Sequence, residues 1–201
     1  TLTHAMGFKG VLGGEYNFNR TEASIWKRFW LPASWGKIDC SVKAGAEWNT
    51  VPFPLLILPE ANLSYITQRE TFCLINNMEF LNDRFASMSI SYDMNGKLFN
   101  RIPLLKNLKW REMFRVRALW GTLTDKNNPF KSSNPDLFRF PTRDGKFTSF
   151  VMDPKVPYVE ASVGIYNIFK LLHVEYVHRF TYRDNPGINK NGIRFMVLMV
   201  F

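Results

Sequence analysis

Polar and apolar residues alternate with a period of two along most of this chain. The clearest stretch, DRFASMSISYDMNG at residues 83–96, separates into two sets. One side carries Arg84, Ala86, Met88, Ile90, Tyr92 and Met94. The other side carries Ser87, Ser89, Ser91, Asp93 and Asn95. Successive side chains of a β-strand point to opposite faces, and no helical period reproduces this pattern. The stretch therefore predicts a two-faced strand.

The same alternation recurs in segments 36–49, 110–122, 158–169, 172–183 and 190–201. Two earlier segments, 5–16 and 20–31, are also expected to be strands, although their two faces are mixed in character. This gives about eight strands, each near the ~9–11 residues that a tilted strand needs to cross a bilayer.

The predicted connections alternate between short and long. Tight turns are expected at NFNR (17–20), at LPASWG (31–36) and at 169–171. Long loops are expected at 50–82 and 124–156, the second of which contains the turn signals DKNNP, SSNPD and TRDG. Alternating short turns and long loops are typical of outer-membrane barrels, whereas loops of this length count against a compact soluble domain.

Two architectures fit the alternation. An ordinary antiparallel sandwich would pack residues such as Met88, Val116 and Val197 together in a dry core. A transmembrane barrel would turn the same residues toward lipid. Charged residues mixed with Gly and Ser on the polar faces, and the length of the strands, favour the barrel. So do aromatic residues near strand ends, namely Trp48, Trp110, Trp120, Tyr158 and Tyr182.

The composition agrees with a barrel. The 201 residues are 46% hydrophobic and 21% charged, and the mean hydropathy is −0.18. No stretch approaches 18 uncharged apolar residues, which excludes a transmembrane helix but not spans that alternate. An aromatic content of 15% suits girdles at two lipid–water interfaces. The start, TLTHAMGFKG, lacks the basic and apolar regions of a signal peptide, so we expect a mature chain or the C-terminal portion of a longer one.

A net charge of +9 can indicate nucleic-acid binding, which stays a minor alternative. We expect no nucleic-acid partner, because the charges recur singly along strands and form no basic tract. We expect them to line a wet interior. The charged residues assigned to this lumen are Lys37, Lys43, Glu47, Asp93, Arg111, Arg115, Arg117, Glu160, Glu175, Arg179 and Arg194. The arginines could form a passage for anions or acidic polypeptide. Interleaved acidic residues favour the other interpretation, a network of ion pairs that braces the wall.

The remaining chemistry is sparse. Cys40 and Cys73 could pair, but two unpaired cysteines are the more common situation. His173 and His178 are five residues apart on one predicted strand, so they should face opposite sides and cannot share a metal. Neither a nucleophile elbow nor a phosphate-binding loop is found. We expect no enzyme activity, no cofactor and no metal site.

Several stretches resemble a known family, most specifically RIPLLKNLKWRE (101–112) and NIFKLLHVEYVHRFTYRDNPGI (167–188). They are similar to the C-terminal barrel of a Bacteroidota outer-membrane family without a settled function. Its longer members begin with a carboxypeptidase-regulatory-like domain. The similarity runs through most of residues 20–201. The strand order also resembles the last half of a BamA/TamA-type barrel, in a superfamily that inserts or translocates outer-membrane proteins.

This resemblance implies roles for several segments. Residues 50–82 would be the sixth extracellular loop, 97–109 a periplasmic turn and 124–156 the seventh loop. Segment 190–201 would be the seam strand of a sixteen-stranded barrel. Its assembly signal would comprise Phe195, Val197, Met199 and Phe201. The superfamily's loop-six motif, an Arg-Gly pair followed by an aromatic residue, is missing; Arg69 precedes Glu70 in QRETF.

The sequence therefore predicts an all-β, transmembrane antiparallel β-barrel domain over residues 1–201, the C-terminal half of a barrel of about sixteen strands. We expect it in the bacterial outer membrane, in contact with the lipid bilayer and with other outer-membrane or periplasmic subunits. The expected function is non-catalytic, in outer-membrane protein assembly or translocation. A channel subunit that anchors a surface complex and passes small solutes is the alternative.

Overall fold

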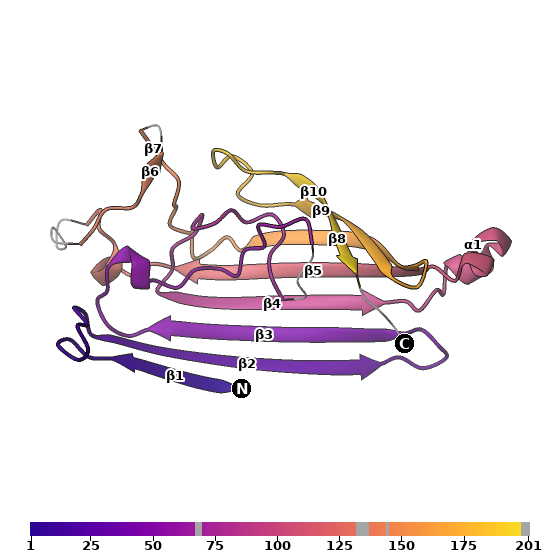
Figure 1. Ribbon diagram of the computed structural model, residues 1–201, viewed down its shortest axis with the longest axis horizontal. Helices are drawn as coiled ribbons and strands as arrows, with labels where there is room; N and C mark the ends of the chain where they lie inside the picture. Colours follow the sequence, from indigo (N-terminus) through magenta and orange to yellow (C-terminus); the bar gives the residue numbers. More distant parts are fainter. Residues whose placement is uncertain (67–69, 132–136, 144, 198–201) are drawn as a thin grey trace.

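Eight strands form one antiparallel sheet in the computed structural model, which describes residues 1–66, 70–131, 137–143 and 145–197 (Figure 1). The strands are β1 (Leu2–Gly7), β2 (Phe18–Trp30), β3 (Lys37–Glu47), β4 (Arg84–Asp93), β5 (Arg111–Thr122), β8 (Tyr158–Ile168), β9 (Leu172–Arg179) and β10 (Asn191–Val197). Each strand of the sheet pairs with the next one along the chain. The prediction of an all-β fold with about eight antiparallel strands is therefore confirmed.

The sheet is open. Strands β1 and β10 form its two edges, and no pairing joins them within the described part of the chain. These eight strands therefore do not close on themselves. A separate hairpin, β6 (Thr142–Arg143) with β7 (Lys146–Phe147), lies within the long connection between β5 and β8.

The strand bounds agree with the alternation except near the start and in segment 172–183, where β9 ends at Arg179. Only residues 5–7 of the expected segment 5–16 lie in a strand: β1 ends at Gly7, and residues 8–17 form the connection to β2. Gly10 and Gly13 adopt φ angles of +86° and +80° there, which glycine reaches without steric cost. The turn expected at NFNR is also wrong, because β2 begins at Phe18 within it.

The connections differ between the two ends of the sheet. Loops 48–83 and 123–157, with the 8–17 and 180–190 connections, lie at one end. The opposite end carries 31–36, 169–171 and the 94–110 connection, which contains α1 (Pro103–Leu108). Figure 1 shows α1 and the β6–β7 hairpin at opposite ends of the sheet. Three 3₁₀ turns complete the structure: η1 (Phe53–Leu55), η2 (Phe99–Arg101) and η3 (Asp125–Asn127). Among the described residues, no helix is long and apolar enough to span a membrane.

The hydrophobic core lies between the long loops and one face of the sheet. One cluster contains Phe72, Ile75, Phe80, Leu119, Met152 and Tyr158. A second contains Val51, Leu56, Leu81, Leu123 and Phe140. Tyr158, expected at a lipid–water interface, is instead fully buried and packs edge-on against Phe72 and Phe80. Gly121 admits loop residue Asn82, because a Cβ there would lie 2.3 Å from the Asn82 Oδ1 atom.

Candidate functional site

The two faces of the sheet differ sharply. The face under the loops, which we call the covered face, presents polar side chains such as Lys43, Arg115 and Glu160. The opposite, apolar face presents Val42, Val116 and Val163, and cross-strand pairing places each set on one side. Val116 is 44% exposed and Val197 is 63% exposed. The dry sandwich core expected from the alternative architecture is therefore not formed.

The exposed apolar side chains extend across the whole sheet. They include Leu2 and Met6 on β1, Ile25 and Phe29 on β2, Val42 on β3, Phe114, Val116 and Trp120 on β5, Val163 on β8, Tyr176 on β9, and Ile193, Phe195 and Val197 on β10. Phe195 and Val197 belong to the predicted assembly signal. The other two members, Met199 and Phe201, lie outside the described residues, as does Arg69 of loop 48–83.

All of the charged residues assigned to a lumen lie on the covered face. Burial is nearly complete for Glu47, Arg115, Arg117, Glu160, Glu175 and Arg179. Lys37, Lys43, Asp93 and Arg194 are partly buried, and Arg111 is exposed. The alternation thus placed these residues on one face, although it did not indicate which of them the loops would bury.

A group of buried ion pairs occupies the centre of the covered face. Arg117 Nη1 lies 2.9 Å from Glu160 Oε1, and Arg115 Nη1 lies 3.1 Å from Glu175 Oε2. Two further hydroxyls donate to these carboxylates: Tyr158 to Glu160 at 2.8 Å, and Ser162 to Glu175 at 3.0 Å. Such pairs are costly to bury but very damaging to break, because the remaining charge has no solvent.

The same charges fasten loop 48–83 to the sheet. Glu160 accepts hydrogen bonds from the backbone N–H groups of Cys73 (2.8 Å) and Leu74 (3.1 Å). Arg179 Nη1 donates to the Leu74 carbonyl at 3.2 Å, and Arg194 Nη2 donates to the Cys73 carbonyl at 2.5 Å. We call this arrangement the loop anchor. It joins β8, β9 and β10 to two consecutive loop residues.

Sequence reasoning missed the acidic residues that the loop itself supplies. Glu79 pairs with Arg179, with Nη1 at 3.0 Å from Oε2. Asp83 accepts from the Thr124 backbone N–H at 3.1 Å and from Asn127 Nδ2 at 2.9 Å, which joins the two long loops. Glu79 lies outside the alternating segments. Asp83 begins the segment 83–96 but was assigned to neither of its faces, so periodicity gave no signal for the burial of either residue.

Cys73 is buried within the loop anchor. Its Sγ lies 3.4 Å from Arg117 Nη1, and neither it nor Cys40 forms a disulfide. Burial raises the pKa of the Cys73 thiol to about 11, because desolvation disfavours the thiolate more than the positive charge of Arg117 favours it. Cys40 lies on the apolar face, opposite Lys27 and Ile90.

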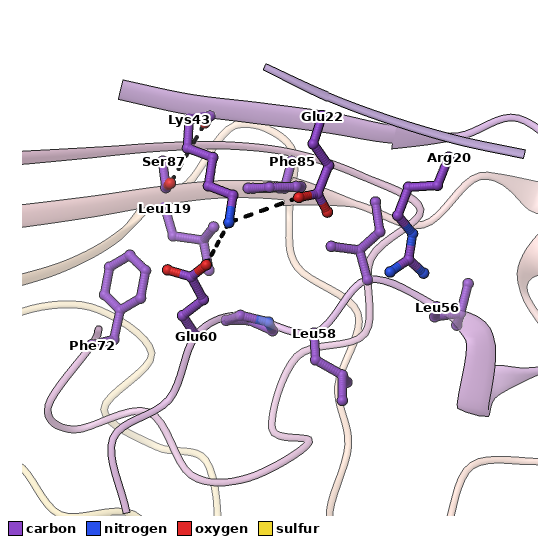
Figure 2. Close-up of a pocket in the computed structure, with 12 residues that line it drawn as sticks. Arg20, Glu22, Lys43, Leu56, Leu58, Glu60, Phe72, Phe85, Ser87 and Leu119 are labelled. Carbon is purple, nitrogen blue, oxygen red and sulfur yellow. Dashed lines mark hydrogen bonds and ion pairs between the residues drawn. The ribbon is translucent and has the colours of Figure 1, made fainter. Parts of the chain in front are cut away.

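Two hollows flank the loop anchor. The first, of about 300 Å³, contains Lys43 between two carboxylates, and Figure 2 shows this arrangement. Lys43 Nζ lies 3.8 Å from Glu22 on β2 and forms a short hydrogen bond with Glu60 from the loop. The second, of about 420 Å³, lies nearer the short-turn end and includes Trp26, Ser89 and His173 in its lining.

Catalytic and metal-binding groups are sparse in the part of the chain that the structure covers. No group of three metal-ligating side chains comes together among the described residues. His173 is buried on the covered face, whereas His178 lies on the apolar face, where it pairs with Asn191. The two histidines therefore face opposite sides, as the spacing predicted. The absence of an enzyme activity stays a prediction.

These features define a class of protein: an open, all-β meander with an apolar outer face and a charged face closed by its own loops. Residues 1–131 match the C-terminal domain of a family of unknown function, DUF5686. The chain therefore belongs to this family, which agrees with the expected resemblance to a family of unsettled function. No curated protein and no solved structure shows a significant match to the chain.

Proposed function

We propose that the eight strands form part of a transmembrane β-barrel in the bacterial outer membrane, with the apolar face toward lipid. The observation that carries this proposal is the inverted polarity of the sheet. Large apolar side chains cover the exposed face, whereas charged side chains are buried under the loops. In water, this arrangement would keep a large apolar area exposed to solvent, which is unfavourable because burial of such area normally drives folding. Contact with the hydrocarbon of a bilayer would take the same area out of water.

The described basic side chains on the apolar face are His4, Lys27, Arg84 and His178, and their positions support this orientation. His4 and Arg84 lie in one cross-strand row near the long-loop end of the sheet, since Arg84 is the first residue of β4. Lys27 is three residues from the end of β2 at the short-turn end, and His178 is one residue from the end of β9 at the opposite end. Strands in such barrels tilt by about 35–45°, which moves these positions toward the two lipid–water interfaces. Long basic side chains near a span's end reach the headgroup region.

Closure of the barrel needs strands beyond these eight. Lipid offers no hydrogen-bond partners, so the free edges of β1 and β10 must be paired within the membrane. We propose about sixteen strands in total, with the others supplied by the same polypeptide or by another subunit. The short-turn end would then face the periplasm and the long loops the exterior.

Within that barrel we propose a non-catalytic role of the BamA-like kind, in assembly or translocation of outer-membrane proteins. The loop anchor supports this role over a channel, because loop 48–83 and its ion pairs occupy the centre of the covered face, between the two hollows. The β10 edge supports it as well. There the Phe195 N–H donates to the Tyr65 carbonyl at 2.7 Å, and a parallel bridge joins Ile66 to Phe195. In the part of the chain that the structure describes, these backbone contacts of the β10 edge involve Phe195 alone. We propose that the rest of this described edge receives an incoming strand or an outer-membrane or periplasmic partner.

Bilayer measurements separate this role from the alternative, a channel subunit that anchors a surface complex and passes small solutes. The protein is reconstituted into liposomes together with an unfolded test barrel, and into a planar bilayer. Accelerated folding of the test barrel without steady conductance supports assembly. Well-defined, steady pores without acceleration refute it in favour of the channel. Stable monodisperse protein in buffer without detergent would contradict the membrane location itself.

A further inference from the structure

The larger hollow has features of a small-molecule site that the proposed barrel does not require. Its volume of about 420 Å³ falls within the ~300–1,000 Å³ typical of ligand pockets. It lies on the covered face, in the half of the sheet nearer the short turns. Strands β2, β3, β4, β5, β8, β9 and β10 all contribute side chains, together with Glu70 of loop 48–83.

The floor of this hollow is lined by serine hydroxyls. Ser41 of β3 lies directly opposite Ser89 of β4, and Ser91 follows two residues along the same face. Positions two residues apart on a strand are separated by roughly 7 Å. None of these hydroxyls hydrogen-bonds to another side chain among the described residues. Each can both donate and accept, so together they form a row of free polar contacts.

One wall carries a histidine that lacks a hydrogen-bond partner. His173 is only 4% exposed, yet its Nε2 atom makes no hydrogen bond in the described structure; Glu175 Oε2, at 3.8 Å, is too far. Buried polar atoms are normally satisfied, and an unsatisfied one is best explained by a missing partner. The Tyr166 ring lies beside it, with 6.4 Å between ring centroids.

The indole of Trp26 also lines the hollow and remains 54% exposed. The Arg28 guanidinium packs over this indole at 5.2 Å from the ring centroid. A half-exposed indole beside polar groups offers a flat apolar surface at the edge of a wet pocket.

The cations that line the hollow among the described residues each lie beside a carboxylate. Arg28 donates two hydrogen bonds to Asp39, at 2.6 and 2.9 Å. Lys37 lies 3.6 Å from Asp93, and Arg115 is paired with Glu175. An anion would have to compete with these carboxylates, so the site favours a neutral ligand. The site therefore suits a neutral ligand with many hydroxyl groups and an apolar C–H face. The serine hydroxyls and the imidazole nitrogen can hydrogen-bond to the ligand hydroxyls, and the indole can pack against the C–H face.

We propose that this hollow binds a neutral saccharide, whose hydroxyl groups meet Ser41, Ser89, Ser91 and His173 while one face of a sugar ring stacks on Trp26. The proposal goes beyond the barrel and its assembly role, since binding needs only the covered face. On the orientation proposed above, the saccharide would enter from the periplasmic end.

Titration calorimetry on the protein folded in a sugar-free amine-oxide detergent tests this site. The probes are maltose and N,N′-diacetylchitobiose, with inorganic phosphate as the charged comparison. We expect at least one disaccharide to bind with a dissociation constant of about 1 mM or below, and phosphate not to bind. Absence of disaccharide binding up to about 50 mM would overturn the proposal, because even weak specific sites saturate there. Binding of phosphate alone would overturn it as well.

Two matched tryptophan variants locate the binding. Trp26→Ala removes the stacking wall and should weaken disaccharide binding by about tenfold, a change of about 1.4 kcal/mol. Trp30→Ala is the control, because Trp30 lies on the same face of the same strand, is 72% exposed and does not line the hollow. It should change binding less than about twofold. Equal losses in both variants, or no loss in Trp26→Ala, would contradict the site. The measurement needs no membrane, so its failure would leave the barrel proposal standing.

Discussion

Substitution of Val116 by arginine tests the orientation of the sheet most directly. Val116 lies near the middle of β5, with five strand residues before it and six after it, and it points to the apolar face. In a bilayer this position would be close to the midplane. In a soluble protein, a partly exposed valine on a strand surface would tolerate a long charged side chain, which could extend into water.

The expected magnitude follows from this depth. An arginine on the lipid face costs about 2–4 kcal/mol at the midplane and about 0–1 kcal/mol near the interface. We therefore expect the free energy of unfolding of Val116→Arg in liposomes to fall by about 2–4 kcal/mol. Val116→Met keeps the position apolar while it adds length, so it should cost less than about 1.5 kcal/mol.

The assay is urea unfolding in phosphatidylcholine vesicles, followed by tryptophan fluorescence, with both variants measured beside the parent protein. A second arginine, in place of Lys27, gives the depth control, since that position already holds a cation near a strand end. It should be close to neutral. If Val116→Arg and Lys27→Arg prove equally well tolerated, the apolar face does not meet hydrocarbon and the membrane proposal is wrong.

The remaining predictions concern the loop anchor. Glu160→Gln should destabilise the fold by about 3–5 kcal/mol, because it leaves Arg117 buried without its carboxylate. Ser162→Ala removes one neutral donor and should cost only about 1 kcal/mol; urea unfolding measures both, and equal effects would contradict the ion-pair account. Cys73, with its raised pKa, should resist alkylation by iodoacetamide at pH 8 in the folded parent protein. It should react in Glu160→Gln, where we expect the loop to detach, and mass spectrometry would measure the difference. The pKa of the Cys73 thiol is near 9 in the unfolded chain and about 11 in the folded protein. The free energy of unfolding of the parent should therefore fall relative to that of Cys73→Ala as the pH rises from 9 to 11. A constant difference in this free energy across the window would count against a buried thiol.

Alternation was sufficient to predict most of the strands, because the two faces of those strands are chemically distinct. Around Ser87, Ser89 and Ser91, every second residue is small and polar, so a shift of one residue would reverse the whole face. The first strand lacked such a contrast. Its residues are followed by Gly10 and Gly13, whose left-handed backbone conformation turns the chain away from the sheet. The sequence alone did not show at which residue the strand ends.

The loop anchor could not be predicted in the same way. Glu160 and Arg117 were recognised as members of the polar face, but their partners come from loop residues far away in sequence. Glu160 contacts Cys73 and Leu74, which are 87 and 86 residues away. Loops have no periodic signal, so the position of their polar groups depends on tertiary packing. Tyr158 illustrates the same limit: it lies at a strand end, yet loop residue Phe80 converts the expected interfacial position into core.

The paired charges also bear on whether the covered face conducts. An anion passage needs a net positive field along its wall, and Arg115, Arg117 and Arg179 could supply one. Each of them is instead within 4 Å of a carboxylate, so the local field is largely cancelled. The ion pairs hold loop 48–83 across the space that a solute would need. Opening that space would expose buried charges in pairs, which is a large conformational step. This cost is consistent with the proposed assembly role and counts against a pore that stays open.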